Sequence, residues 1–244
     1  MTANHEYASN RGHHMTAGVD TSFDYHSDTP PGKDPDAYSP TLRRHHQLLW
    51  SKELPSGARF DLAPEPRSYL AHRSPLGVFR LSSDAITTRL RKRASRVVRD
   101  LPDHELPEWG GYTAGSALVF PGIKIGRKQT INGARGFNRT IADRFDLTLE
   151  CIRRHYLREE PNPLADVLHR YADFFALFED FSGYVDFFLL QDLVEEDGKT
   201  IRFFHRFEDF RTPAVPKTAD EYLQYLRLSN DFITSRNRRI DAQP

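Results

Sequence analysis

The clearest hydrophobic pattern in the chain is a wide apolar stripe at helical spacing that follows Asn162. Apolar residues that recur every three to four positions form one face of a helix. Asn162 can cap this helix, and Pro163 suits its first turn because no N–H is needed there. The stripe is therefore predicted to be a buried helical face. It comprises Leu164, Val167, Leu168, Tyr171, Phe174, Phe175 and Phe178.

A second helix is predicted from a cap at Asn138 or Thr140 to about Leu157. Steps of 100° per residue separate an apolar arc from a polar arc. The apolar arc comprises Ile141, Phe145, Leu149, Ile152 and Tyr156, and the polar arc comprises Asp143, Asp146, Glu150, Arg153 and Arg154. The polar arc is interpreted as a solvated face with ion pairs four residues apart, between Glu150 and Arg154 and between Arg139 and Asp143.

Strands are predicted where apolar residues alternate or form short runs. GVFRLSS, residues 77–83, alternates like a half-buried strand, and residues 112–131 indicate two short strands broken at Pro121 and Gly122. YVDFFLLQDLV has the continuous apolar character of a strand buried on both faces, and an Asp197-Gly198 turn leads from it into TIRFF. This pattern predicts a buried β-hairpin at about 184–204.

The order of these elements predicts an α+β fold. We expect a single domain with a mixed or antiparallel sheet that includes the 184–204 hairpin and is packed by three or more helices. The last helix is predicted to begin at a capping box formed by Thr218 and Glu221.

The N-terminal part is predicted to differ from the rest. Residues 1–20 are polar and are interpreted as a disordered extension, so the α+β domain is expected at 21–244. Residues 21–41 carry four prolines and four aspartates, which indicate an extended, turn-rich arm. Ser39 or Thr41 can cap a short helix directly after it.

Composition and charge narrow the protein class. Lys plus Arg and Asp plus Glu number 34 each, so the whole molecule has no long-range attraction to nucleic acid or membrane. The single cysteine, Cys151, fits a reducing compartment, and no apolar run is long enough to span a membrane. These features predict a soluble, cytoplasmic protein. The strong catalytic and metal motifs are absent, and the adjacent histidines at 13–14 and 45–46 diverge in a helix, so neither a metal nor a cofactor is predicted.

A basic run, RLRKRASRVVR, occupies residues 89–99 and is followed by the acidic DLPDHELPE. One interpretation is a solvated helix complemented by neighbouring acids. The other is a nucleic-acid patch, because clustered arginines can contact phosphates.

A polar stripe interrupts the apolar flank of the second helix at Arg144, Thr148, Cys151 and His155. A buried guanidinium needs an acidic partner. Arg144 either pairs with a structural acid such as Asp186 or Asp192, or lines a pocket for an anionic ligand. In the second case His155 could move a proton near neutral pH, and Cys151 beside it could act as a nucleophile.

The loop ahead of this helix favours the pocket. GRKQTINGARGFNR places four cationic side chains among glycines close to a helix N-terminus, an arrangement suited to phosphate. The predicted ligand-binding residues are Arg127, Lys128, Arg135, Arg139 and Arg144, and the predicted proton carriers are His155 and Asp146.

The hypothesis is an intracellular protein that binds a phosphate-bearing or nucleotide-like ligand at residues 126–139 and the following helix. Whether it is an enzyme stays open at this stage. Two alternatives also stay open. One is a non-enzymatic interaction module, such as a phage or prophage accessory protein, and the other is nucleic-acid binding through residues 89–99.

Several segments together resemble an uncharacterised bacterial and prophage family, a domain of unknown function. They are SDTPPGKDPDAYSPTLRRHHQLLWSKELPSG, YLAHRSPLGVFRLSSD, VFPGIKIGRKQTINGARGFNRTIADRFDLTLECIRRHY, YADFFALFEDFSGYVDFFLLQDLV and SRNRRI. The resemblance would run from about Phe23 to Ile240. It implies one intact domain that includes the 21–41 arm, and it implies no activity, ligand or catalytic residue.

Overall fold

The central element is an antiparallel sheet, seen in a computed structural model that describes residues 18–65, 70–88, 90, 94–99, 101–107 and 110–243. Its four strands lie in chain order: β3 (Ala63–Pro64), β4 (Leu70–Ser74), β5 (Gly77–Ala85) and β6 (Ala117–Pro121). The long β5 pairs with both β4 and β6, which confirms the strand predicted at 77–83. A separate two-stranded sheet joins β1 (Lys52–Glu53) to β2 (Arg59–Phe60).

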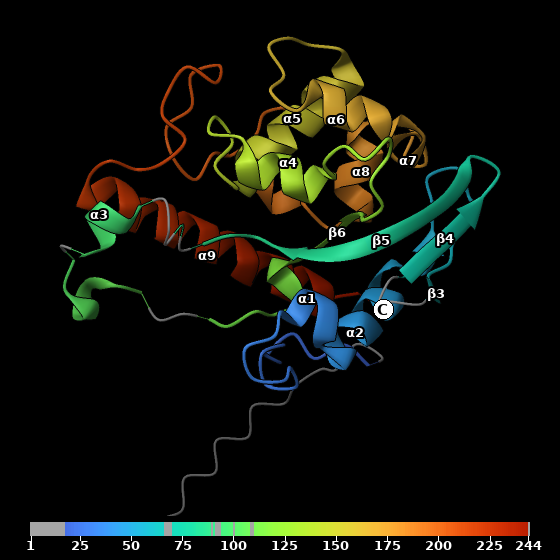
Figure 1. Ribbon diagram of the computed structural model, residues 1–244, viewed down its shortest axis with the longest axis horizontal. Helices are drawn as coiled ribbons and strands as arrows, with labels where there is room; N and C mark the ends of the chain where they lie inside the picture. The colour runs from blue at the N-terminus through green and yellow to red at the C-terminus, as the bar shows by residue number, and fades with distance from the viewer. Residues whose placement is uncertain are drawn as a thin grey trace, which may run out of the picture.

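Helices cover both faces of this sheet (Figure 1). The α-helices are α1 (Pro35–Tyr38), α2 (Pro40–Trp50), α3 (Ser95–Arg99), α4 (Ile131–Phe137), α5 (Phe145–Leu157), α6 (Ala165–Arg170), α7 (Ala172–Ala176), α8 (Phe181–Phe187) and α9 (Ala219–Asp241). Short 3-10 turns are η2 (Asp103–Glu105), η3 (Ala114–Ser116) and η4 (Gln191–Leu193). Figure 1 shows α4 to α8 on one side of β5 and α1 and α2 on the other. The predicted α+β class with an antiparallel sheet is confirmed.

The arm at 21–41 packs against the domain. Tyr25 is fully buried, and its hydroxyl is hydrogen bonded to Nδ1 of His45 in α2 at 2.8 Å. Ser39 caps α2 by accepting from the Leu42 N–H at 3.0 Å. Most of the predicted extension, including the 13–14 histidine pair, lies outside the described residues, but Val19 is buried, so packing begins before residue 21.

The first strand of the predicted hairpin at 184–204 is replaced by α8 and η4, which corrects that part of the prediction. Residues 181–187 form α8, capped by Asp180, whose Oδ1 accepts from the Gly183 N–H at 2.8 Å. An apolar run that is buried all round cannot be assigned to strand or helix from periodicity alone. Of the predicted strand pairing, a single antiparallel bridge forms between Val194 and Ile201. Gly198 lies in the turn between them and has φ 68°.

The second predicted helix is shorter than expected. Ala142 and Asp143 have φ values of 51° and 66°, which a right-handed helix cannot contain, so α5 begins at Phe145. The polar arc was predicted to be solvated, but Asp146 is 0% exposed and Glu150 is 4% exposed. The 204–214 segment lies against this face, because Asp146 accepts from the Phe204 N–H and Arg154, the partner of Glu150, also pairs with Asp209. The pair between Glu150 and Arg154 is confirmed, at 2.6 Å. The predicted pair between Arg139 and Asp143 is wrong, because Asp143 pairs with Arg135 at 3.4 Å.

Other sequence predictions match more closely. All seven residues of the apolar stripe at 164–178 are buried, although the helix breaks into α6 and α7. The capping box holds at the start of α9, where the Thr218 hydroxyl accepts from the Glu221 N–H at 3.3 Å. The second strand predicted within 112–131 is absent, since β6 ends at Pro121 and α4 starts at Ile131.

Arg236 of α9 is fully buried against the end of β6. Its Nε and Nη2 donate to the Phe188 carbonyl at 3.2 and 3.0 Å, and Nη1 donates to the carbonyls of Gly115 and Ala117 at 2.9 and 2.8 Å. These bonds join three chain segments far apart in sequence. Burial lowers the pKa of Arg236 to about 10, so the side chain keeps its charge at neutral pH. No helix in the described part of the chain is long and apolar enough to cross a membrane.

Candidate functional site

Arg135, a predicted ligand-binding residue, is fully buried and pairs with the protein itself. Its Nη1 forms an ion pair with Asp84 of β5 and lies 3.4 Å from Oδ1 of Asp143. Its Nε donates to the Thr148 hydroxyl at 3.2 Å, and its Nη2 donates to the Asp143 carbonyl at 3.0 Å. Arg135 therefore ties α4 to β5 and α5.

Arg144 is also fully buried, and its acidic partner is Asp146. The two side chains form a bidentate pair, so the predicted partners Asp186 and Asp192 are wrong. Nη1 of Arg144 donates to the Ala214 carbonyl at 3.0 Å, and Oδ2 of Asp146 accepts from the Phe204 N–H at 2.9 Å. The pair fastens the 204–214 segment to the start of α5. Both Asp146 oxygens are thus occupied within the protein.

The remaining predicted site residues lie at the surface in different places. Arg127 and Lys128 are exposed beside α6, and Arg139 is exposed beside Lys217. His155 is half-buried in a separate groove that it shares with His169 and Lys128. Burial, assisted by the charge of His169, lowers the pKa of His155. The structure does not bring the seven predicted residues into one cleft.

Cys151 does not fit the nucleophile interpretation. It is fully buried, and burial raises the pKa of its thiol far above the ordinary range. A reactive cysteine needs its thiolate form and access to a substrate. Cys151 therefore acts as a small apolar core residue.

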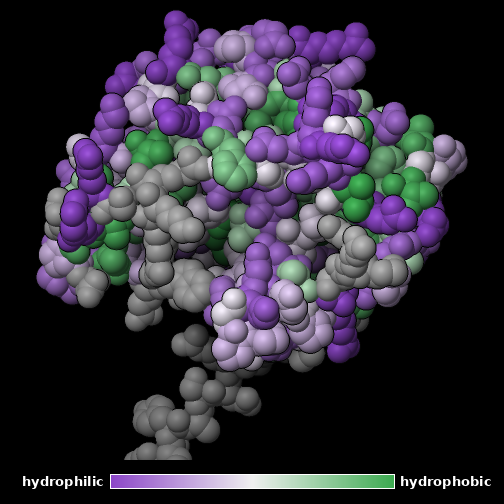
Figure 2. All heavy atoms as spheres, in the orientation of Figure 1, coloured by the Kyte–Doolittle hydropathy of each residue, from purple (hydrophilic) through white to green (hydrophobic). Residues whose placement is uncertain are grey.

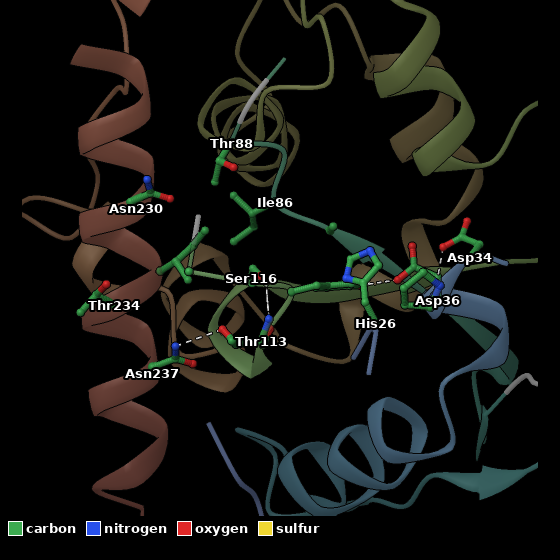
Figure 3. A pocket seen from close by; sticks show the side chains of 16 residues that line it. His26, Asp34, Asp36, Ile86, Thr88, Thr113, Ser116, Asn230, Thr234 and Asn237 are labelled. Carbon is green, nitrogen blue, oxygen red and sulfur yellow. Dashed lines mark hydrogen bonds between the residues drawn. The ribbon is translucent and has the colours of Figure 1, made fainter. Parts of the chain in front are cut away.

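A cavity of about 360 Å³ lies between α1, η3 and α9 (Figure 3). Asn230, Thr234 and Asn237 project from α9 on one side, and His26, Asp34 and Asp36 lie on the other. Thr113 and Ser116 lie between these two sides. The volume falls within the range of about 300 to 1,000 Å³ that small-molecule sites occupy.

The cavity is lined by acidic and neutral polar groups. Among its described lining residues, Asp34 and Asp36 are acidic, His26 is the sole residue that can carry positive charge, and none is Lys or Arg. The described residues that line it are His26, Asp34, Pro35, Asp36, Ala85, Ile86, Thr88, Gly110, Gly111, Tyr112, Thr113, Ser116, Asn230, Ile233, Thr234 and Asn237. This lining disfavours an anionic ligand.

Asp36 is a carboxyl of the cavity whose acidity is strongly altered. Burial raises the pKa of Asp36 to about 7; a hydrogen bond from Tyr112 opposes the rise, and the charges of Asp84 and Asp34 add to it. Such a carboxyl changes its protonation state at neutral pH. Perturbed carboxyl groups of this kind are typical of sites that transfer protons.

The Tyr112 hydroxyl ties Asp36 to β5. It donates to an Asp36 carboxyl oxygen and also lies 3.0 Å from the Asp84 carbonyl oxygen. A phenol has one proton to donate, so the two acceptors compete for it.

Local backbone requirements hold the cavity in place. Asp34 caps α1, with Pro35 in its first turn, and this sets the position of Asp36. Gly111 has φ +83°, and a Cβ there would lie 3.1 Å from the Asp24 side chain. A Cβ on Gly115 would lie 2.4 Å from the Ile233 carbonyl oxygen, so η3 can pack directly on α9.

The α9 side of the cavity carries two side-chain amides, and one of them is hydrogen bonded within the protein. Asn237 accepts from the Gly115 N–H at 2.6 Å and donates to the Thr113 hydroxyl at 3.1 Å. Asn230 also lines the cavity, and within the described part of the chain its amide has no hydrogen-bond partner. Asn230 is therefore available to a ligand. Nothing at the sequence level singled out Asp36, Tyr112 or Asn230.

Metal-ligand geometry and similarity to known proteins also bear on function. The described residues contain no group of three or more His, Cys, Asp or Glu side chains arranged to hold a metal ion. No curated protein and no solved structure matches the chain. The model of a family of unknown function, DUF6994, matches residues 19–240, almost the whole described length and including the arm. The chain belongs to this family of unknown function.

Proposed function

We propose that the protein binds a small uncharged or cationic molecule, rich in hydroxyl or amine groups, in the Asp36 cavity. Asp36 exchanges a proton with this ligand. The observation that carries the proposal is a carboxyl with a pKa of about 7 at the wall of a cavity of ligand size. A group that titrates near neutral pH can serve as a general acid or a general base.

The other lining groups support the same ligand class. Asn230 offers both a donor and an acceptor, and the hydroxyl of Thr234 lies on the same helix. Acidic side chains would repel a carboxylate or phosphate, whereas they attract an ammonium group. A ligand with several hydroxyl or amine groups therefore satisfies the cavity better than an anion does.

A thermal-shift panel of monosaccharides, nucleosides and polyamines tests the proposal. We expect at least one compound to raise the melting temperature of the wild type, because a ligand that binds the folded state stabilises it. Asn230→Leu should abolish that rise while leaving the melting temperature without ligand nearly unchanged. The proposal fails if no compound acts, or if the rise is the same in Asn230→Leu.

Asp36→Asn provides the second arm of this experiment. Asn keeps the shape of the side chain but cannot exchange a proton at neutral pH. The affinity of the wild type should change between pH 6 and pH 8, and the affinity of Asp36→Asn should not. A pH dependence that is identical in both proteins would show that Asp36 takes no part.

A further inference from the structure

A second hollow, of about 600 Å³, lies on the opposite side of the sheet, between the 122–130 loop, α4 and α6. Its lining combines apolar and polar residues, and Arg127, Lys128, Arg170 and Phe137 are among them. The other apolar residues of the lining are Ala134, Pro163, Leu164 and Val167. The hollow shares no residue with the Asp36 cavity. Figure 2 shows that the surface over α4 to α6 is mostly hydrophilic, with small hydrophobic areas between.

The lining has an excess of positive charge that the protein does not neutralise. Arg127 and Lys128 are exposed, and within the described residues neither makes an ion pair. Arg170 donates to the carbonyls of Asp166 and Gln129 at 3.0 and 2.9 Å, so it meets no carboxylate there. Its buried Nε has no hydrogen-bond partner. Asp166 is the one acid among the residues that line the hollow.

Phe137 is the second unusual feature of the lining. Its side chain is 79% exposed, well above the other exposed large apolar residues of the described chain, the next being Tyr38 at 49%. It ends α4, where the following Asn138 is fixed by a hydrogen bond from its side chain to the Pro163 carbonyl at 3.3 Å. An exposed aromatic ring beside cations offers a stacking face next to a phosphate site.

We propose that this hollow binds a nucleoside phosphate. The base stacks on Phe137 near the other apolar residues of the lining, and the phosphate lies between Arg127, Lys128 and Arg170. Arg170 is held in one orientation by two main-chain carbonyls, so its positive charge is fixed in place before the ligand arrives. Arg127 has φ 61° directly after Gly126 at φ 59°, and this turn sets where the loop presents its cations.

The proposed site includes Arg127 and Lys128, two of the ligand-binding residues predicted from the sequence. Arg135 and Arg144 form ion pairs with carboxylates inside the protein, whereas Arg127 and Lys128 do not among the described residues. Phe137 and Arg170 are added by the fold, since α6 brings Arg170 next to the loop. The site is independent of the Asp36 cavity, and neither proposal requires the other.

Isothermal titration calorimetry at low salt with AMP, adenosine and inorganic phosphate tests the site. We expect AMP to bind more tightly than either adenosine or phosphate, because it alone has both the base and the phosphate. Phe137→Ala should weaken AMP binding about tenfold or more, the usual loss of a base-stacking ring, and leave phosphate binding unchanged. Phe137→Tyr, which keeps a ring, should bind AMP as the wild type does.

Charge variants complete the experiment. The double variant Arg127→Gln, Lys128→Gln should weaken both AMP and phosphate, whereas Asp166→Asn should strengthen both by removing a repelling carboxylate. All four positions are at the surface, and circular dichroism confirms that each variant is folded. Asp36→Asn should bind AMP as the wild type does. The inference is overturned if AMP does not bind at millimolar concentration, or if its affinity is unaffected by Phe137→Ala or by the double charge variant.

Discussion

Replacing Asp36 by Asn should remove a specific part of the pH dependence of stability. Burial raises the pKa of Asp36 from 3.8 to about 7 in the folded protein, so folding takes up a proton between these two values. The stability that this proton provides is fully present below about pH 4 and is lost as the pH rises to about 7. Asn has no such proton, so its contribution does not change with pH.

The size of this effect follows from the two pKa values. A tenfold difference in proton affinity corresponds to about 1.4 kcal/mol, so the full interval corresponds to about 4 kcal/mol. Asp36 is only partly buried and water screens its surroundings, which reduces the expected change to about 2 to 4 kcal/mol. The fall should therefore be large against the error of a denaturation experiment.

Urea unfolding at pH 5, 6, 7 and 8, followed by tryptophan fluorescence, measures the difference. The free energy of unfolding of the wild type should fall relative to that of Asp36→Asn as the pH rises. Buried histidines such as His46 act in the opposite direction, but they are present in both proteins and cancel. Asp166→Asn is the matched control, because it makes the same change at an exposed residue that does not line the Asp36 cavity. Parallel curves for wild type and Asp36→Asn would refute the reasoning.

Three further predictions concern the buried groups. Arg236→Ala should lower the free energy of unfolding by about 3 to 5 kcal/mol in urea titrations, because it leaves three buried carbonyls without a donor. The control Arg238→Ala, on the exposed side of α9, should change that free energy by less than about 0.5 kcal/mol. Equal effects of the two variants would contradict the role assigned to Arg236. Arg144→Met should cost about 3 to 5 kcal/mol by leaving the Asp146 charge unpaired. In a double-mutant cycle, the variant Arg144→Met, Asp146→Leu should lose less than the sum of Arg144→Met and Asp146→Leu, and additive losses would contradict the pairing. Cys151 should react with a thiol reagent only as fast as the protein unfolds, and rapid labelling of the native state would contradict its burial.

The sequence predicted those elements whose signals are local. Ser39 and Thr218 cap the helices they were expected to cap, because a cap depends on a few neighbouring residues. The burial of the apolar stripe at 164–178 was predictable because its residues recur at helical spacing, which places all of them on one face of a helix. The run at 184–194 was wrongly assigned to a strand. A segment that is buried on all sides has no hydrophobic period, so its sequence does not distinguish a helix from a strand.

The candidate site could not be predicted because it is assembled from distant segments. Asp36 and Asn230 are almost two hundred positions apart in the sequence. They line the same cavity because α9 packs on η3 beside α1. The arginines were misjudged for a related reason. The sequence indicated an acidic partner for Arg144 alone, and it placed Asp146 on a face expected to be solvated. Arg135 was assigned to a ligand, but packing of α4 on the sheet makes Asp84 its partner.

The most direct test of the account is the pKa of Asp36 itself. Carbon-13 spectra of aspartate-labelled protein, recorded from pH 4 to pH 9 for the wild type and for Asp36→Asn, follow each carboxyl separately. The account predicts a carboxyl resonance that titrates near pH 7 in the wild type and is missing in Asp36→Asn. If the resonance missing in Asp36→Asn instead titrates near pH 4, the cavity holds an ordinary carboxylate and the proposed proton exchange is wrong.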